Sequence, residues 1–210
     1  MKRTPAKQTV FINCPFDEEF RPFFKAMVFC ITFLDHHPTF AESISSSDFR
    51  LKKITELIRK ARLGIHDLSR NTSTKEGEKA RFNMPFELGL DMGSILFGGK
   101  SLSQKKIIVF DTNPNDYDHY IGDISGQDIL VHQNQPEILI KEIRNWFSRL
   151  YPNLLFPSFT HIWNAYRQFN EKLPLELKDS WSTHELHSMQ MSEYRHYAEK
   201  WILKLKNPIG

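Results

Sequence analysis

The chain has 210 residues, of which 40% are hydrophobic and 25% charged, a composition typical of one globular domain with an appendage. Its formal net charge of +3 comes from scattered Lys and Arg, without the dense basic stripe of a nucleic-acid-binding protein. No apolar run approaches the roughly 20 residues that a membrane span needs. Cys14 and Cys30 are too few for a disulfide framework. We therefore expect a soluble, cytoplasmic protein without nucleic-acid or membrane partners.

Strands and helices alternate along the first part of the chain. The segment from Thr9 to Asn13 is β-branched and apolar and ends at Cys14-Pro15, which predicts a buried strand followed by a turn. Asp17 is a suitable cap for a helix from Phe20 to Leu34, where apolar residues recur at helical spacing. A second, short strand is expected from Pro38 to Glu42.

The middle of the chain continues the alternation. Asp48 is expected to cap a helix from Phe49 to Arg62, and the run from Leu63 to Leu68 predicts the third strand. The polar segment from Asn71 to Lys79 predicts a loop, and a further helix is expected from Met84-Pro85 to about Leu96. The expected apolar stripe of the first of these helices consists of Leu51, Ile54, Leu57, Ile58 and Ala61.

Two more strands and one more helix complete the pattern. The strands are expected at Lys106–Phe110 and Asp128–His132, and the helix at Pro136–Leu150. Strands that alternate with helices and are apolar on both sides predict a parallel sheet with helices on both faces. We therefore expect an α/β domain over residues 1–150 and a helical extension over residues 151–210.

The extension is rich in large aromatic side chains at helical spacing. One stripe contains Trp163, Tyr166 and Phe169, and another contains Tyr194, Tyr197 and Trp201. Each stripe must be buried, either against the α/β part of the same chain or in a homo-oligomer. We favour the first, because neighbours in sequence usually pack locally, and the extension would then partly cover the ligand cleft.

Polar residues follow three of the predicted elements at positions where ligands usually bind. In an open parallel sheet, ligands bind beyond the carboxyl ends of the strands. The segments Asn13–Asp17, Asp67–Arg70 and Asn83–Glu87 should all reach that edge, so we expect them to line one cleft.

Glu87 is the sharpest candidate for chemistry. It lies near a helix start, close to Phe82, Phe86 and Gly89. A carboxylate in such surroundings can stabilise a cationic transition state, such as a sugar oxocarbenium ion, or attack its anomeric carbon. The alternative is a carboxylate that only stabilises the helix N-terminus. Asn83 could likewise bind a ligand hydroxyl or cap the helix.

The remaining candidates also have two interpretations each. Asp67 closes an apolar strand, where a carboxylate must be paired, so it either orients a ligand or pairs with Arg70 or Arg81. The arginine forks suit a phosphate, or lie solvated at the surface. His66 lies within a strand and is expected to be a hydrogen-bonded core histidine. Glycine-rich phosphate loops and serine elbow motifs are absent from the sequence, which disfavours kinases, P-loop NTPases, Rossmann dehydrogenases and serine hydrolases.

Taken in order, these motifs resemble a known family. Val10–Asp17 is similar to the first strand and loop of Toll/interleukin-receptor-like (TIR-like) domains and of nucleoside 2-deoxyribosyltransferases. Arg50–Arg70 resembles their helix, strand and terminal aspartate, and Asn83–Gly89 resembles the segment that carries their catalytic glutamate. Lys105–Phe110 resembles the next strand. The similarity spans about residues 9 to 147, with Cys14-Pro15 where many TIR domains have serine or tyrosine.

The resemblance implies a flavodoxin-like fold and cleavage of a base–ribose bond, in NAD or a nucleoside. In bacteria, proteins of this kind often serve in antiphage defence. Glu87 would be the catalytic glutamate, with Asn83 and Asp67 on the ribose hydroxyls. The expected ligand-binding residues are Asn13, Phe16, Asp17, Asp67, Ser69, Arg70, Arg81, Phe82 and Asn83.

In this interpretation Phe16 or Phe82 would stack on the base, and Arg70 or Arg81 would hold a phosphate. Neither a metal nor a cofactor is expected, and the nucleotide itself is the substrate or ligand. The alternative function is a non-enzymatic module that senses a nucleotide or binds a protein through the same cleft.

Overall fold

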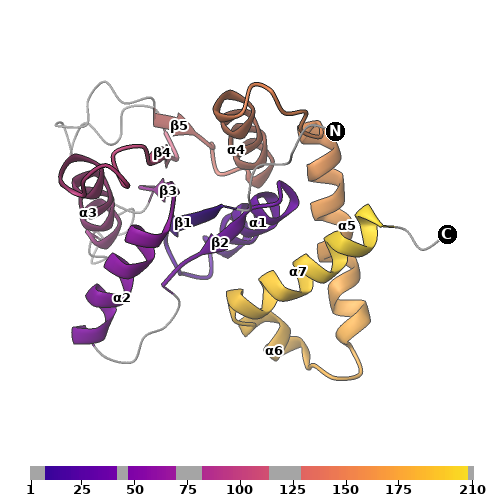
Figure 1. The fold of residues 1–210 in the computed structure, drawn as a ribbon. Coiled ribbons are helices and arrows are strands. Elements are labelled where there is room, and N and C mark those ends of the chain that lie inside the picture. The colour runs from indigo at the N-terminus through magenta and orange to yellow at the C-terminus, as the bar shows by residue number, and fades with distance from the viewer. Residues whose placement is uncertain (1–7, 42–46, 70–81, 114–128, 208–210) are drawn as a thin grey trace.

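The computed structural model describes residues 8–41, 47–69, 82–113 and 129–207 of the chain. Its five strands form one parallel sheet in the order β2-β1-β3-β4-β5 (Figure 1). This order is that of flavodoxin-like doubly wound folds, so the predicted fold class is confirmed. The strands are β1 (Thr9–Asn13), β2 (His37–Thr39), β3 (Leu63–Asp67), β4 (Lys106–Asp111) and β5 (Ile129–Val131).

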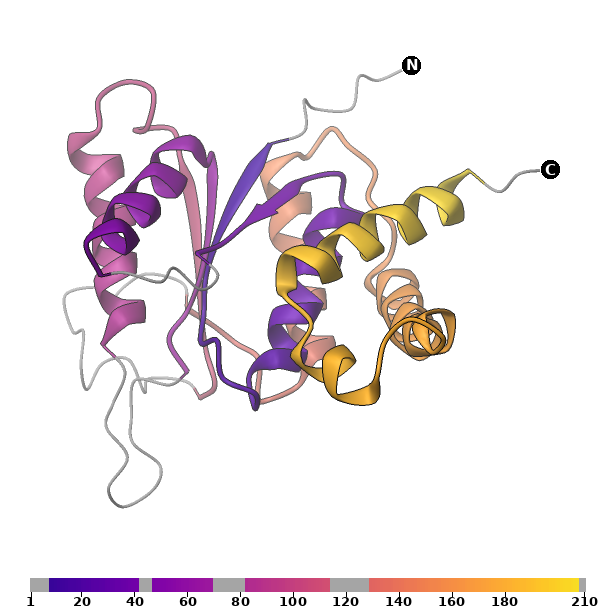
Figure 2. The same cartoon turned by 90° about the horizontal axis from the view of Figure 1, so that it is seen from below.

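Helices cover both faces of this sheet (Figure 2). Helices α2 and α3 cover one face, α1 and α4 cover the other, and α5 and α7 pack outside α1. Within the described ranges, none of these helices has the length and apolar character needed to cross a membrane. The helices are α1 (Arg21–Phe33), α2 (Ser47–Lys60), α3 (Asn83–Phe97), α4 (Pro136–Leu150), α5 (Phe159–Leu177), α6 (Thr183–Ser188) and α7 (Met191–Lys206).

Most element boundaries agree with the sequence prediction to within a few residues, but helix α2 differs in two respects. It begins at Ser47, one residue before Asp48, which we expected to precede the helix. Leu51, which we expected on the buried stripe, is 46% exposed, because the stripe that faces the sheet begins one turn later at Ile54. The loop expected at Asn71–Lys79 lies outside the described residues.

Helix α1 is enclosed between the sheet and the C-terminal helices. Nearly all of its side chains from Phe23 to Phe33 are buried, as expected for a helix that is apolar all round. The centroid of the Phe29 ring lies 5.5 Å from the ring centroids of both Tyr166 and Phe169 on α5, and 6.0 Å from that of Trp201 on α7. The aromatic stripes of the extension therefore pack against the α/β part of the same chain, with Tyr166, Phe169 and Tyr194 buried and the other three rings half-buried.

One hydrophobic core joins the two parts. It runs from Val10 and Ile12 in the sheet, through α1, to Phe169 on α5 and Tyr194 on α7. Tyr194 is fully buried, and its hydroxyl donates to Oδ1 of Asn170 at 3.2 Å. The C-terminal helices are thus a layer of this core.

This arrangement predicts the effect of removing residues 151–210. Truncation exposes the outer side of α1, which would form a large apolar patch of the kind that drives aggregation. We expect the chain that ends at residue 150 to aggregate or to lose its cooperative thermal transition, as measured by size-exclusion chromatography and circular dichroism. A truncated chain that is monomeric and melts like the full chain would contradict this role of the C-terminal layer.

Candidate functional site

The topology places a crevice between strands β1 and β3. The chain leaves β1 through α1 on one face and reaches β2, then returns through α2 on the other face to β3, on the far side of β1. The carboxyl ends of β1 and β3 are therefore the switch point of the sheet, where doubly wound folds bind their ligands. Cys14 follows β1 directly, and Leu68 follows β3.

The three polar segments do meet at this edge. The Asn13 amide at the end of β1 donates to the carbonyl oxygen of Met84 in the first turn of α3, at 2.8 Å. Burial, together with the nearby charges of Asp67, Glu87 and Asp17, raises the pKa of the Cys14 thiol well above its usual 9.0. Each of the three segments thus contributes a carboxylate that acts on Cys14, and this buried thiol is a packing group instead of a nucleophile.

Glu87 lies in the second turn of α3 and is 5% exposed. Burial raises the pKa of its carboxyl from 4.5 to about 7, and the charge of Arg50 offsets part of that rise. The two groups are not hydrogen-bonded, since Nη2 of Arg50 lies 3.8 Å from Oε1 of Glu87. Glu87 is thus a buried carboxyl that changes charge near neutral pH, which is typical of residues in acid–base or charge-stabilising roles.

The residues just before Glu87 remain accessible. Phe82 and Phe86 are 66% and 55% exposed, and Asn83 is exposed as well. The residue in the cap position of α3 is Phe82, with no side-chain cap, so the alternative that Asn83 caps the helix is wrong. Arg70 and Arg81, the expected phosphate ligands, lie outside the described residues.

Asn13 belongs to a chain of buried polar side chains that reaches Asp91, one turn after Glu87 on α3. Besides contacting Met84, its amide nitrogen lies 3.0 Å from Nδ1 of His66. Nε2 of His66 lies 3.0 Å from Oδ2 of Asp91, whose Oδ1 lies 2.6 Å from Nζ of Lys105. Because Asn13 can only donate to Nδ1, the neutral imidazole carries its proton on Nε2 and donates it to Asp91. The expectation that His66 is a hydrogen-bonded core histidine is confirmed.

Asp91 is the centre of this chain. Burial alone would raise its pKa, but the hydrogen bond from His66, together with the ammonium group of Lys105, holds the pKa below its usual 3.8. The close approach requires Gly64 on β3, since a Cβ there would lie 2.6 Å from Oδ2 of Asp91. Asp91 was missed in the sequence, although it lies four residues after Glu87 and so on the same side of α3.

Asp67 is also fully buried at the end of β3. Its Oδ1 accepts hydrogen bonds from the backbone nitrogen of Ser69, at 3.0 Å, and from the Ser69 hydroxyl. Its Oδ2 lies 3.2 Å from Nε2 of His132, without the alignment of a hydrogen bond. Nδ1 of His132 accepts from the backbone nitrogen of Asn134 at 3.1 Å, so the imidazole proton lies on Nε2, facing the carboxylate. Asp67 and Ser69 thus bond each other, and His132, directly after β5, is a partner that the sequence analysis missed.

Phe16 and Asp17, in the segment that follows β1, line a pocket of about 300 Å³ beside the switch point, between the α/β part and the C-terminal helices. Oδ1 of Asp17 accepts a hydrogen bond from the backbone nitrogen of Phe20 at 2.9 Å, which caps the turn before α1. Phe16 is 43% exposed, and its ring lies 5.3 Å from that of Phe24. We call this cavity the switch-point pocket; it is lined by Phe16, Asp17, Arg21, Phe24, Arg50, Ser188, Met189, Gln190 and Met191.

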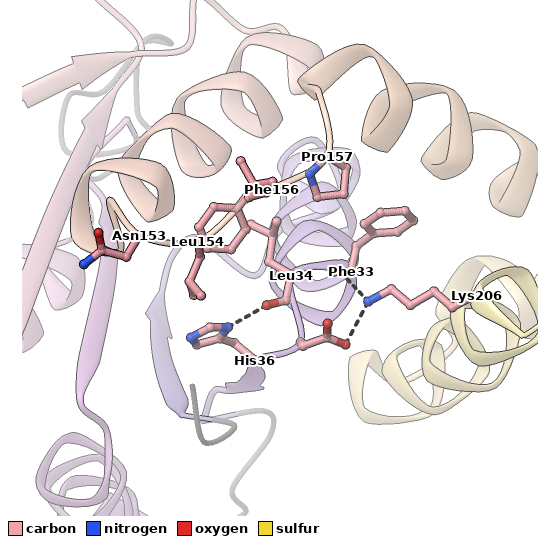
Figure 3. Close-up of a pocket in the computed structure, with 10 residues that line it drawn as sticks. Phe33, Leu34, His36, Asn153, Leu154, Phe156, Pro157 and Lys206 are labelled. Atoms are coloured by element: carbon pink, nitrogen blue, oxygen red, sulfur yellow. Dashed lines mark hydrogen bonds and ion pairs between the residues drawn. The ribbon is translucent and has the colours of Figure 1, made fainter. Parts of the chain in front are cut away.

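A second cavity, of about 310 Å³, lies at the opposite edge of the sheet, where α1 ends and β2 begins (Figure 3). Its mouth holds Lys206, whose Nζ donates to the carbonyl oxygen of Phe33 at 2.9 Å and pairs with Asp35 at 2.8 Å. It contains none of the predicted site residues, so we assign the chemistry to the switch point.

Comparisons with known proteins found no match, so the site is assigned from its geometry. No protein-family model, no curated protein and no solved structure matches this chain.

Proposed function

We propose that the protein cleaves the N-glycosidic bond of a nucleotide or nucleoside, NAD included, with Glu87 as the acting carboxylate. The observation that carries the proposal is a nearly buried carboxyl, 5% exposed, at the switch point of a parallel sheet. The exposed Phe82 and Asn83 in the turn before it are free to contact a ligand. The resemblance of Asn83–Gly89 to the catalytic segment of TIR-like proteins supports the same role, and with it a function in antiphage defence.

The chemistry follows from charge. As the bond between the anomeric carbon and the base lengthens, the electron pair leaves with the base and positive charge develops on the sugar. The ionised carboxylate of Glu87 stabilises that charge, or forms a bond to the anomeric carbon that breaks again when water attacks. Water adds to the carbon and gives up one proton, either to the solvent or to a base that departs with a negative charge. A carboxylate removed from water interacts with the developing cation more strongly than an exposed one does.

The test is to incubate the protein with NAD and with a panel of nucleosides and nucleotides, and to measure free base by chromatography. Release of base that is lost in Glu87→Gln supports the proposal. A folded protein that binds a nucleotide and releases no base from any of them would instead support the non-enzymatic alternative.

The pKa of Glu87 predicts how the activity depends on pH. Because the ionised form is the active one, kcat/KM should rise with pH and level off above an inflection near 7. The charge of Arg50 lowers this pKa, so Arg50→Gln should move the inflection to higher pH. Arg59→Gln, on the last turn of the same helix, is the matched control and should leave the profile unchanged. Identical profiles for the two variants would contradict the coupling of Arg50 to Glu87.

A further inference from the structure

The wall of the switch-point pocket comes from two distant parts of the chain. Phe16, Asp17 and Arg50 belong to the α/β part, whereas Ser188–Met191 connects α6 to α7 in the C-terminal layer. We propose that this connection completes the ligand site, and that Arg50 binds the phosphate of a nucleotide held in the pocket. The proposal rests on the proposed function, because it names the part of the substrate that the pocket would read.

The connection is firmly held against the α/β part. Met189 and Met191 are 3% and 2% exposed and belong to the main core. Nη2 of Arg21, in the first turn of α1, donates to the carbonyl oxygen of Met189. A wall fixed by burial and by a charged donor restricts which ligands fit, as in the largely preformed sites that bind small molecules.

Arg50 is the group in this pocket that is free to bind an anion. Within the described part of the chain its guanidinium makes no hydrogen bond, and its one charge partner is Glu87 at 3.8 Å. A guanidinium presents five donors in a planar fork that matches a phosphate. The same side chain lines the pocket and approaches Glu87, so a phosphate on Arg50 would lie within a few bonds of a sugar carbon held at Glu87.

The other lining residues fit the same ligand. The pocket lining carries two guanidinium groups, of Arg21 and Arg50, and one carboxylate, of Asp17, whose Oδ1 already accepts from Phe20. The exposed part of the Phe16 ring offers a stacking surface, and Phe24 contacts this ring edge-to-face, with 5.3 Å between the ring centroids. A volume of about 300 Å³ is at the lower end of the range for small-ligand sites, and suits one nucleotide unit.

The experiment measures binding in the Glu87→Gln protein, so that turnover cannot interfere. The probes are nicotinamide mononucleotide and the four ribonucleoside 5′-monophosphates, each compared with its own nucleoside by titration calorimetry. We expect at least one nucleotide to bind about 10- to 100-fold more tightly than its nucleoside, the gain typical of hydrogen bonds to a charged group. Adding Arg50→Gln should remove this difference, and Arg50→Lys should restore part of it.

The wall is tested by filling the pocket from the C-terminal side. Gln190 and Ser188 are exposed, so Gln190→Trp and Ser188→Trp should fold and should each weaken nucleotide binding at least tenfold. Gln168→Trp, at an exposed position of α5 away from the pocket, is the control and should bind like the parent. If both pocket variants bind like Gln168→Trp, or if the phosphate adds nothing to affinity, the inference is wrong.

These results separate the two proposals. Tight, Arg50-dependent nucleotide binding without base release by the unmodified protein would retain the pocket and refute the glycosidase. Base release with binding that ignores Arg50 and the tryptophan substitutions would retain the glycosidase and refute the pocket. A protein that neither binds these probes nor releases base would refute both.

Discussion

Glu87→Gln should abolish base release and at the same time make the protein more stable at alkaline pH. Glutamine keeps the size of the side chain but carries no charge to stabilise the sugar cation. Losses of about 100- to 1,000-fold are typical when one transition-state stabiliser is removed, and we expect kcat to fall at least that far. Free base is the readout, measured by chromatography at pH 8, where Glu87 is ionised.

The gain in stability follows from the sign of the pKa shift. Burial raises the pKa of Glu87 from 4.5 to about 7, so ionising this group opposes folding. The stability that the fold has with a neutral carboxyl at this position is therefore lost as the pH rises through about 7. The shift corresponds to about 3 kcal/mol. Glu87→Gln should therefore resist urea better than the parent at pH 8 and equally well at pH 4.

The matched control is Glu176→Gln, at an exposed position of α5, which should change neither activity nor stability. A Glu87→Gln protein that is less stable at pH 8 would mean that the carboxylate is needed by the fold. Full turnover in that variant would remove Glu87 from the mechanism.

Lys105→Met should destabilise the fold strongly. Nζ of Lys105 lies 2.6 Å from Oδ1 of Asp91 and donates to the carbonyl oxygen of Ile58 at 2.9 Å. Both charged side chains are buried, so methionine would leave the carboxylate of Asp91 without its cation. Breaking one side of a buried pair typically costs about 3–5 kcal/mol, a large share of the total stability of a domain.

Urea denaturation followed by circular dichroism measures this cost. Lys106→Met changes the next residue of the chain, which is exposed, and should shift the midpoint little. Adding Asp91→Asn to Lys105→Met removes the stranded charge and should recover part of the loss. If Lys105→Met and Lys106→Met unfold at the same urea concentration, the buried ion pair of Lys105 and Asp91 does not stabilise the fold.

The sheet could be predicted from sequence because its signals are local. Short apolar strands such as Thr9–Asn13 and Leu63–Asp67 alternate with amphipathic helices, and that alternation by itself implies a parallel, doubly covered sheet. The edge at which Glu87 lies followed from the same reasoning, because parallel strands place their carboxyl ends together.

The partners of the site residues could not be predicted in this way. Arg50, Asp91 and His132 reach their partners through tertiary contacts with residues on other elements, and no spacing in the sequence specifies such contacts. Asn13 and Asp67 were expected to contact a ligand, but their side chains form hydrogen bonds to other groups of the protein. A polar residue at a strand end is equally suited to either use, and only the packing around it decides.

The second covering of α1 did have a signal in the sequence. We predicted Phe20–Leu34 as a helix because apolar residues recur there at helical spacing, but Phe23 to Phe33 contains few polar residues on any side. A helix that is apolar all round needs a partner on each side. One partner is the sheet, and the other is the aromatic surface of α5 and α7.

The enclosure of α1 also determines the order in which this protein can mature on the ribosome. Chains are synthesised from the N-terminus, and their earlier parts begin to fold first. The contacts of Phe29 with Tyr166, Phe169 and Trp201 can form only after residues up to Trp201 have emerged. Until then the nascent α/β part carries a bare aromatic surface, which is a natural target for the chaperones that bind unfinished chains.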